Sequence, residues 1–196
     1  EAMDKIKESG IASRRCFVVE TMGRDCGYLA LMSGIAAGAE RIYTNEDGIS
    51  LDDLANDVHW LRESFAHGRR LFLAVRNENA SHNYTTDFIA RLLEEESHGM
   101  YDVRQVVLGH MQQGGSPSPF DRLLANRLGY RALNLIDDEL AAHQDGSWFI
   151  GVNESGMRPC SMDTMPSLVD AAHRRPREQW WLQLRTIARM VSDEVR

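Results

Sequence analysis

Two segments of the chain share one layout, in which an apolar strand leads into a glycine-containing loop and a helix begins shortly after the loop. The first is Phe17-Val-Val-Glu-Thr-Met-Gly-Arg-Asp-Cys-Gly27, and the second is Val107-Leu-Gly-His-Met-Gln-Gln-Gly-Gly-Ser116. Such loops bring backbone N–H groups and a helix N-terminus to the carboxyl end of a strand, where anionic ligands bind in α/β proteins. The two segments therefore predict an α/β fold with an anion site.

The rest of the chain alternates between the two element types. The continuously apolar run 71–75 is typical of a strand covered on both faces. Ser118, Pro119 and Asp121 form a helix start of the capping-box type. This alternation predicts layered, mainly parallel sheets flanked by helices. The expected strands are 16–20, 41–44, 71–75, 103–109, 148–152 and 159–162, and the expected helices are 27–38, 52–67, 86–97, 118–135 or beyond, and 178–195.

Composition limits the classes of partner. The formal net charge of −7 argues against a nucleic acid or an anionic membrane surface, because both favour a basic protein. No apolar run approaches the roughly 18 residues of a membrane span. The three cysteines are odd in number and lack C-x-x-C spacing, which predicts reduced thiols and a cytoplasmic location. They are Cys16, Cys26 and Cys160.

The first loop offers cations beside a flexible backbone. Arg15 and Arg24 bracket the strand, and Gly23 allows a ligand to approach the main chain closely. Guanidinium groups suit phosphate because they present paired donors and stay charged. The alternative for either arginine is a solvated surface residue.

The second loop is one residue away from a P-loop, but Gly115 stands where the phosphate-binding lysine would be. We reject the P-loop interpretation for that reason. The loop instead offers neutral donors, His110, Gln112 and Gln113, and Arg104 lies an even number of residues before His110 on the entering strand. The alternatives are a partly buried, satisfied histidine and a simple glycine turn.

A carboxylate and a basic cluster complete the candidates. Glu78 follows a buried strand, and it could accept hydrogen bonds from sugar hydroxyls or neutralise Arg76. The basic run 172–177 precedes the terminal helix, where a solvated helix entry is the alternative.

Together the segments closely resemble the ATP-dependent 6-phosphofructokinases. Residues 17–38 resemble the V-E-x-M-G-R-x-x-G-x-L-A signature of that family, and residues 108–122 resemble its L-G-H-x-Q-R-G-G-x-P-x-x-x-D-R signature. The resemblance spans nearly the whole chain and implies a phosphofructokinase-like fold. A late arginine also contacts the ligand in the family, and we assign it to Arg174, with Arg175 as the rival. The positions that the resemblance assigns to fructose phosphates are Arg15, Met22, Gly23, Arg24, Glu78, Arg104, His110, Met111, Gln112 and Gln113.

Three features resemble the C-terminal regulatory half of the animal-type enzyme. Gln113 replaces the arginine of catalytic halves, residues 76–88 resemble R-N-E-x-x-x-x-N-Y-T-T-D-F, and residues 176–182 resemble P-x-E-Q-W-W-L. Arg24 departs from this pattern, because animal regulatory halves carry glycine there. The resemblance implies that the chain binds the activator fructose 2,6-bisphosphate.

In the family, the complete enzyme transfers the γ-phosphoryl group of Mg-ATP to fructose 6-phosphate in glycolysis. The glycine-rich ATP loop and the loop with the catalytic aspartate lie upstream in the family, and neither motif occurs here. No initiator methionine precedes Glu1. We therefore expect residues 1–196 to be a partial phosphofructokinase domain, most of one half. It would have no catalytic or metal-binding residue and no activity alone, and the implied assembly is a homotetramer.

Two rival interpretations remain. The chain could come from a catalytic half that binds fructose 6-phosphate with an unusual Gln113. It could also be a generic α/β nucleotide-binding module, although it has neither G-x-G-x-x-G nor G-x-x-x-x-G-K. A purely structural module would leave the arginines around both loops unexplained. For a sugar bisphosphate, we expect Arg15, Arg24, Arg104 and His110 to converge on one cleft.

Overall fold

The computed structural model describes residues 1–10, 12–153 and 156–192, and the chain divides into two compact units. Unit 1 comprises Glu1–Gln113 and Gln179–Arg196, and unit 2 comprises Gly114–Glu178. We describe each unit by itself.

Unit 1 is built on a four-stranded sheet in which every pair of neighbouring strands is parallel. The strand order is β2-β3-β1-β4. Because the strands are parallel, their carboxyl ends lie along one edge of the sheet. The strands are β1 (Arg15–Thr21), β2 (Arg41–Tyr43), β3 (Leu71–Asn77) and β4 (Asp102–Val107).

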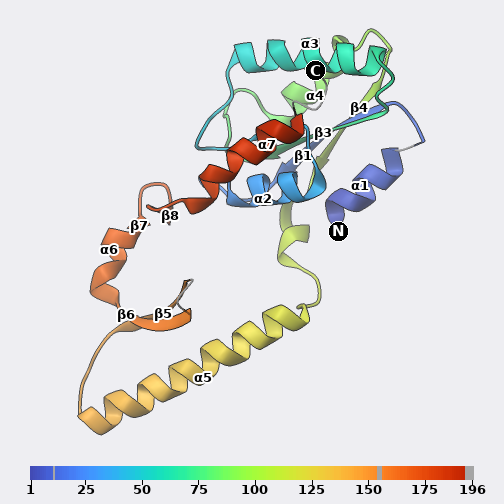
Figure 1. Cartoon of the computed structure of the whole chain (residues 1–196). Helices are drawn as coiled ribbons and strands as arrows, with labels where there is room; N and C mark the ends of the chain where they lie inside the picture. The colour runs from blue at the N-terminus through green and yellow to red at the C-terminus, as the bar shows by residue number, and fades with distance from the viewer. Residues whose placement is uncertain (11, 154–155, 193–196) are drawn as a thin grey trace. The chain divides into compact units, whose positions relative to one another are not determined.

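Helices cover both faces of this sheet, as the apolar strands predict. Phe17 and Val19 of β1 pack towards α1 (Ala2–Gly10) and α2 (Tyr28–Ala37). The alternate residues of β1 pack on the other face, which belongs to α3 and α4, so Figure 1 shows helices on both sides of the sheet. Both faces of β3 are buried at residues 72–75, which confirms the prediction for that run. The second pair of helices is α3 (Leu51–Ala66) and α4 (Thr86–Glu95).

The connections place a topological switch point at the centre of the sheet. The chain leaves β1 for α2 on one face, and it leaves the neighbouring β3 for α4 on the opposite face. The two loops leave the carboxyl ends of β1 and β3 towards opposite faces of the sheet. Open α/β sheets bind their ligands at such positions.

The end of the chain corrects one expectation. Instead of one helix over 178–195, the structure has a 3-10 turn, η3 (Trp180–Leu184), followed by α7 (Arg185–Ser192). Trp181 is 5% exposed and packs edge-on against Tyr28 of α2, with ring centroids 5.1 Å apart. Packing of the indole on α2 favours the tighter turn over a continuous helix. The last three residues of the expected helix lie outside the described residues.

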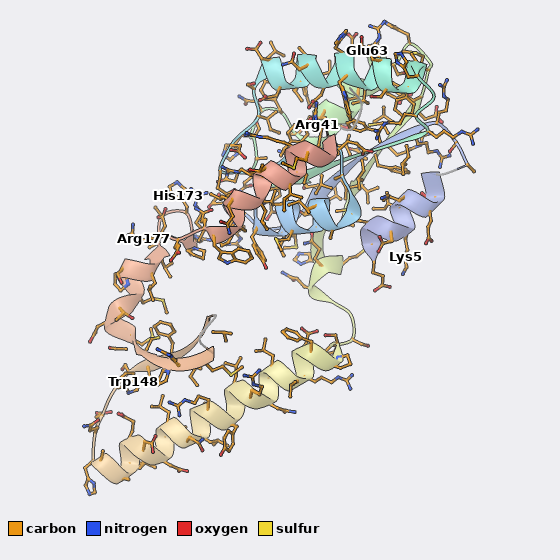
Figure 2. The ribbon with its side chains drawn as sticks, viewed as in Figure 1. Lys5, Arg41, Glu63, Trp148, His173 and Arg177 are labelled. Atoms are coloured by element: carbon orange, nitrogen blue, oxygen red, sulfur yellow. The ribbon has the colours of Figure 1, made fainter. Side chains whose placement is uncertain are left out.

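Unit 2 is a long helix with short hairpins. The predicted capping box of α5 (Pro119–Ala142) is confirmed, since Ser118 and Asp121 bond each other's backbone N–H groups. The late strands are also confirmed, but they pair with each other in an antiparallel hairpin. Trp148 of that hairpin, labelled in Figure 2, lines a hollow of about 700 Å³ against α5, and no α5 residue is buried. The remaining elements are β5 (Trp148–Asn153), β6 (Gly156–Ser161), η2 (Met162–Thr164), α6 (Met165–Leu168), β7 (Val169–Asp170) and β8 (Arg175–Pro176).

No helix within the described part of the chain is both long and apolar enough to cross a bilayer.

Candidate functional site

Three segments meet at the switch point, and hydrogen bonds between them define the candidate site. The main-chain N–H groups of Gly23 and Arg24 both donate to Oε1 of Glu78, at 2.9 and 2.7 Å. The N–H group of Met22 donates to Oε1 of Gln112, at 2.7 Å. Gln112 belongs to η1 (Gly109–Gln113), the turn that follows β4. The structure thus brings together the two predicted loops and the predicted carboxylate.

The backbone of the first loop requires glycine at position 23. Gly23 has φ of +151°, and an added Cβ would lie 2.5 Å from the carbonyl oxygen of Cys26 and 2.9 Å from Nδ2 of Asn77. Arg24 follows with φ of +48°, a left-handed conformation that non-glycine residues adopt infrequently. The loop therefore turns sharply at Gly23 and leaves the Arg24 side chain exposed.

In the second loop, His110 and Gln113 pair with each other. Nδ1 of His110 lies 3.0 Å from Oε1 of Gln113, and because an amide oxygen can only accept, the ring donates through Nδ1. This tautomer leaves Nε2 of His110 to meet a ligand. An arginine in place of Gln113 has no acceptor, so it could not accept the bond that the Nδ1–H group donates. Met111 lies between them, and its side chain is exposed.

The α2 N-terminus does not offer the anion site that the first loop suggested. The N–H group of Gly27, its N-cap, lies 3.0 Å from both carboxylate oxygens of Glu46. The negative charge of Glu46 stabilises this helix end and would repel a phosphate there. The anion site expected at the first loop stays a prediction, and side chains are left as the groups that could hold an anion there.

Arg15 and Arg104 do not join the other candidates within one chain. Arg15 begins β1 and donates to the main-chain oxygen of Ser9, whereas the loop with Gly23 follows the last residue of β1, about 20 Å further along the strand. Arg104 pairs in register with Phe17, near the same amino-terminal edge. The expected convergence on one cleft is therefore wrong for these two residues.

The same-face argument for Arg104 and His110 fails because β4 ends before His110. The strand stops at Val107, and the chain then turns into η1. Arg104 instead donates to the Val103 carbonyl oxygen at 2.7 Å and lies 3.7 Å from the carboxylate of Asp102.

Arg174 lies in unit 2, in the turn between β7 and β8, where it is exposed with φ of +51°. Its rival, Arg175, begins β8. Both stay predictions, because they belong to a different unit from the two loops.

Sequence reasoning missed a buried charge pair beneath the site. Arg76 is 2% exposed, and its Nη1 donates to Glu20 at 2.8 Å and to the main-chain oxygen of Glu78 at 3.0 Å. Arg76 therefore bonds the backbone of Glu78, whereas the Glu78 carboxylate bonds the first loop. Burial lowers the pKa of the Arg76 guanidinium, and the nearby Glu20 carboxylate opposes that shift. A charged residue near the end of a buried apolar strand was the available signal.

The described residues contain no cluster of three or more His, Cys, Asp or Glu side chains that could hold a metal ion.

The parallel sheet, with loops at a switch point along its carboxyl edge, places the chain among the open α/β proteins. The chain belongs to the phosphofructokinase family, whose model matches residues 1–136. The predicted family and fold class are thereby confirmed.

Individual relatives support the same family assignment. The chain is 41% identical over 194 residues to an ATP-dependent 6-phosphofructokinase of Dictyostelium discoideum, and 42% identical over 200 residues to the human muscle-type enzyme. These alignments cover 98% and 96% of this chain but only 23% and 26% of the relatives. The chain thus spans about a quarter of their length.

Solved structures show the same fold. Phosphofructokinase of Saccharomyces cerevisiae superposes with a TM-score of 0.91 at 33% identity, over 99% of this chain and 27% of that chain. The Pichia pastoris enzyme in the T-state superposes with a TM-score of 0.87 at 33% identity, over 100% of this chain and 24% of that chain. A pyrophosphate-dependent phosphofructokinase of Marinobacter aquaeolei shares the fold at 14% identity, with a TM-score of 0.63 over 97% and 51%.

Proposed function

We propose that this chain is part of a longer 6-phosphofructokinase and contributes to its effector-binding half, where it binds fructose 2,6-bisphosphate. The complete enzyme would phosphorylate fructose 6-phosphate with Mg-ATP in the cytoplasm. The observation that carries the proposal is Gln113, an amide that pairs with His110 where catalytic halves carry an arginine.

The groups at the switch point suit a phosphorylated sugar. Arg24 presents an exposed guanidinium for a phosphate, and Nε2 of His110 faces outward from its pair with Gln113. The bonds from Gly23 and Arg24 to the Glu78 carboxylate both reach Oε1, so Oε2 is the oxygen that would accept a sugar hydroxyl. These three side chains supply cationic, neutral and anionic contacts for one ligand.

Arg15 and Arg104 fit the proposal as contributions to a neighbouring subunit. Both lie near the amino edge of the sheet, away from the loops of their own chain. In a homo-oligomer, this edge of one subunit would complete the site of the next. This arrangement gives Arg15 and Arg104 a role without requiring them to meet the loops of their own chain.

ATP and Mg²⁺ belong to other parts of the proposed enzyme. The sequence has no glycine-rich ATP loop, and the described residues offer no cluster of metal ligands. We therefore assign both cofactors to segments outside this chain and derive no step of phosphoryl transfer through its residues.

A second candidate is a fragment of a catalytic half. Arg24 favours this candidate, because regulatory halves of the animal type carry glycine at that position. Steady-state kinetics of Arg24→Ala in the full-length protein separate the two. The effector half predicts that the half-saturating concentration of fructose 2,6-bisphosphate rises by about ten- to a hundred-fold, the loss of one charge-assisted contact. A rise in the KM for fructose 6-phosphate measured without activator would instead assign the site to catalysis.

A further inference from the structure

The Arg76 guanidinium joins three segments beneath the candidate site. Its Nη1 reaches Glu20 of β1 at 2.8 Å and Thr86, the first residue of α4, at 3.3 Å. Thr86 also donates its hydroxyl proton to the Glu20 carboxylate. The network thus links β1, β3 and the start of α4 at the switch point.

The same guanidinium holds both ends of the turn that carries Glu78. Nη1 donates to the main-chain oxygen of Glu78 at 3.0 Å, and Nη2 donates to that of Ser81 at 2.6 Å. A planar guanidinium can bridge two carbonyl groups at fixed separation, whereas a single ammonium group cannot match both directions. The turn is therefore clamped from its buried side.

On its outer side, this turn organises the first loop. The Glu78 carboxylate accepts from Gly23 and Arg24, and Nδ2 of Asn79 donates to Asp25 at 3.0 Å. A shift of the turn would move these acceptors away from the loop. The position of Arg24, the exposed cation of the site, thus depends on Arg76 through Glu78.

A contribution to stability alone does not explain the Arg76–Glu20 ion pair. A buried ion pair loses hydration, and replacing it with apolar side chains is often neutral or stabilising. Arg76 also has a buried Nε with no hydrogen-bond partner. A neutral, well-packed pair would serve the core equally well, but it would not clamp the two carbonyl groups.

We propose that Arg76, paired with Glu20, is a positioning residue that sets the geometry of the Glu78 turn and hence of the sugar-phosphate site. Arg76 lies beneath the ligand and does not touch it. This inference rests on the proposed function for the identity of the ligand.

The test is the double variant Glu20→Gln/Arg76→Met of the full-length protein, which removes the clamp without leaving a buried charge unpaired. We expect the half-saturating concentration of fructose 2,6-bisphosphate to rise by at least about ten-fold, as expected when a binding loop loses its support. Arg76→Lys keeps the charge and can retain the bond to Glu20. Its half-saturating concentration should lie between those of the parent and the double variant.

The matched control is Arg41→Met/Asp57→Asn, another ion pair of unit 1 with one buried and one partly exposed member. Arg41, labelled in Figure 2, donates to Asp57 and pairs in register with Ala74, two residues before Arg76 in β3. This control should melt at a temperature similar to that of Glu20→Gln/Arg76→Met, but it should keep the parent's half-saturating concentration of fructose 2,6-bisphosphate. The inference would be overturned if the half-saturating concentration rose equally in Glu20→Gln/Arg76→Met and in the control. It would also be overturned if that concentration did not rise in Glu20→Gln/Arg76→Met, or if Arg76→Lys kept the parent's value.

The parent protein decides the proposed function separately. If fructose 2,6-bisphosphate does not activate it, the effector assignment fails. The KM for fructose 6-phosphate then becomes the readout for the same variants, with the same outcomes.

Discussion

At the scale of single residues, Gly23 shows how the chain fixes the shape of its site. The loop makes its turn at a φ that side chains rarely adopt, and the space for a Cβ is filled by Cys26 and Asn77. The N–H groups on either side of the turn then reach Glu78 and Gln112. Backbone conformation and side-chain acceptors thus specify the same loop.

We expect Gly23→Ala to displace this loop. Backbone strain of this kind typically costs about 1–3 kcal/mol, and here the added methyl group also contacts main-chain atoms. Sugar-phosphate affinity of the full-length protein should fall by about ten-fold or more, measured by equilibrium binding. Gly99→Ala is a control with positive φ and no atom within 4 Å of the added Cβ. Equal losses in both variants would show that the site geometry is not the cause.

Cys16 gives a prediction for thiol reactivity and pH. It is fully buried in β1, and burial raises the pKa of its thiol well above the ordinary value. Cys26 and Cys160 are partly exposed. With a thiol-specific reagent at pH 8, Cys26 and Cys160 should react in the native chain and Cys16 only after denaturation. Rapid modification of Cys16 in the native chain would contradict its burial.

The raised pKa of the Cys16 thiol also makes the free energy of unfolding depend on pH. Above the ordinary thiol pKa, the unfolded state loses a proton that the folded state keeps, so the free energy of unfolding decreases as pH rises there. Denaturant titrations above and below the ordinary thiol pKa should show that decrease, and Cys16→Ala should reduce it.

At the scale of elements, local chemistry explains the helix starts that the sequence predicts. The Ser118 capping box is visible in the sequence and is confirmed. Ser50 forms the same kind of box with Asp53 at the start of α3, where only the helix itself was predicted. The 3-10 turn at Trp180 was not predictable, because it accompanies packing on α2, a contact distant in sequence.

Ser50→Ala should weaken α3. Loss of an N-cap side chain costs about 1 kcal/mol. Denaturant titration of the chain should show that decrease, whereas Ser33→Ala, a partly exposed serine within α2 that caps no helix, should change stability less. An unchanged midpoint for Ser50→Ala would show that other contacts determine where α3 begins.

At the scale of the whole molecule, the sequence predicts the family and the parallel sheet, but not which arginines meet. The motifs around Gly23 and His110 identify the two loops correctly. The register and length of the strands decide which arginines reach these loops, since Arg104 pairs with Phe17 and β4 ends at Val107. Strand register and the buried Arg76 network depend on contacts between distant segments, so residue spacing alone could not supply them.

The proposed function requires this chain to form an effector site that is distinct from the catalytic site. The most direct measurement is equilibrium binding of fructose 2,6-bisphosphate to the full-length protein in the presence of saturating fructose 6-phosphate. We expect the bisphosphate to bind under this condition, and we expect Glu78→Ala to weaken its binding by about ten-fold or more, because the loop with Arg24 loses its acceptor. Competition between the two sugars, or unchanged bisphosphate binding in Glu78→Ala, would contradict the claim.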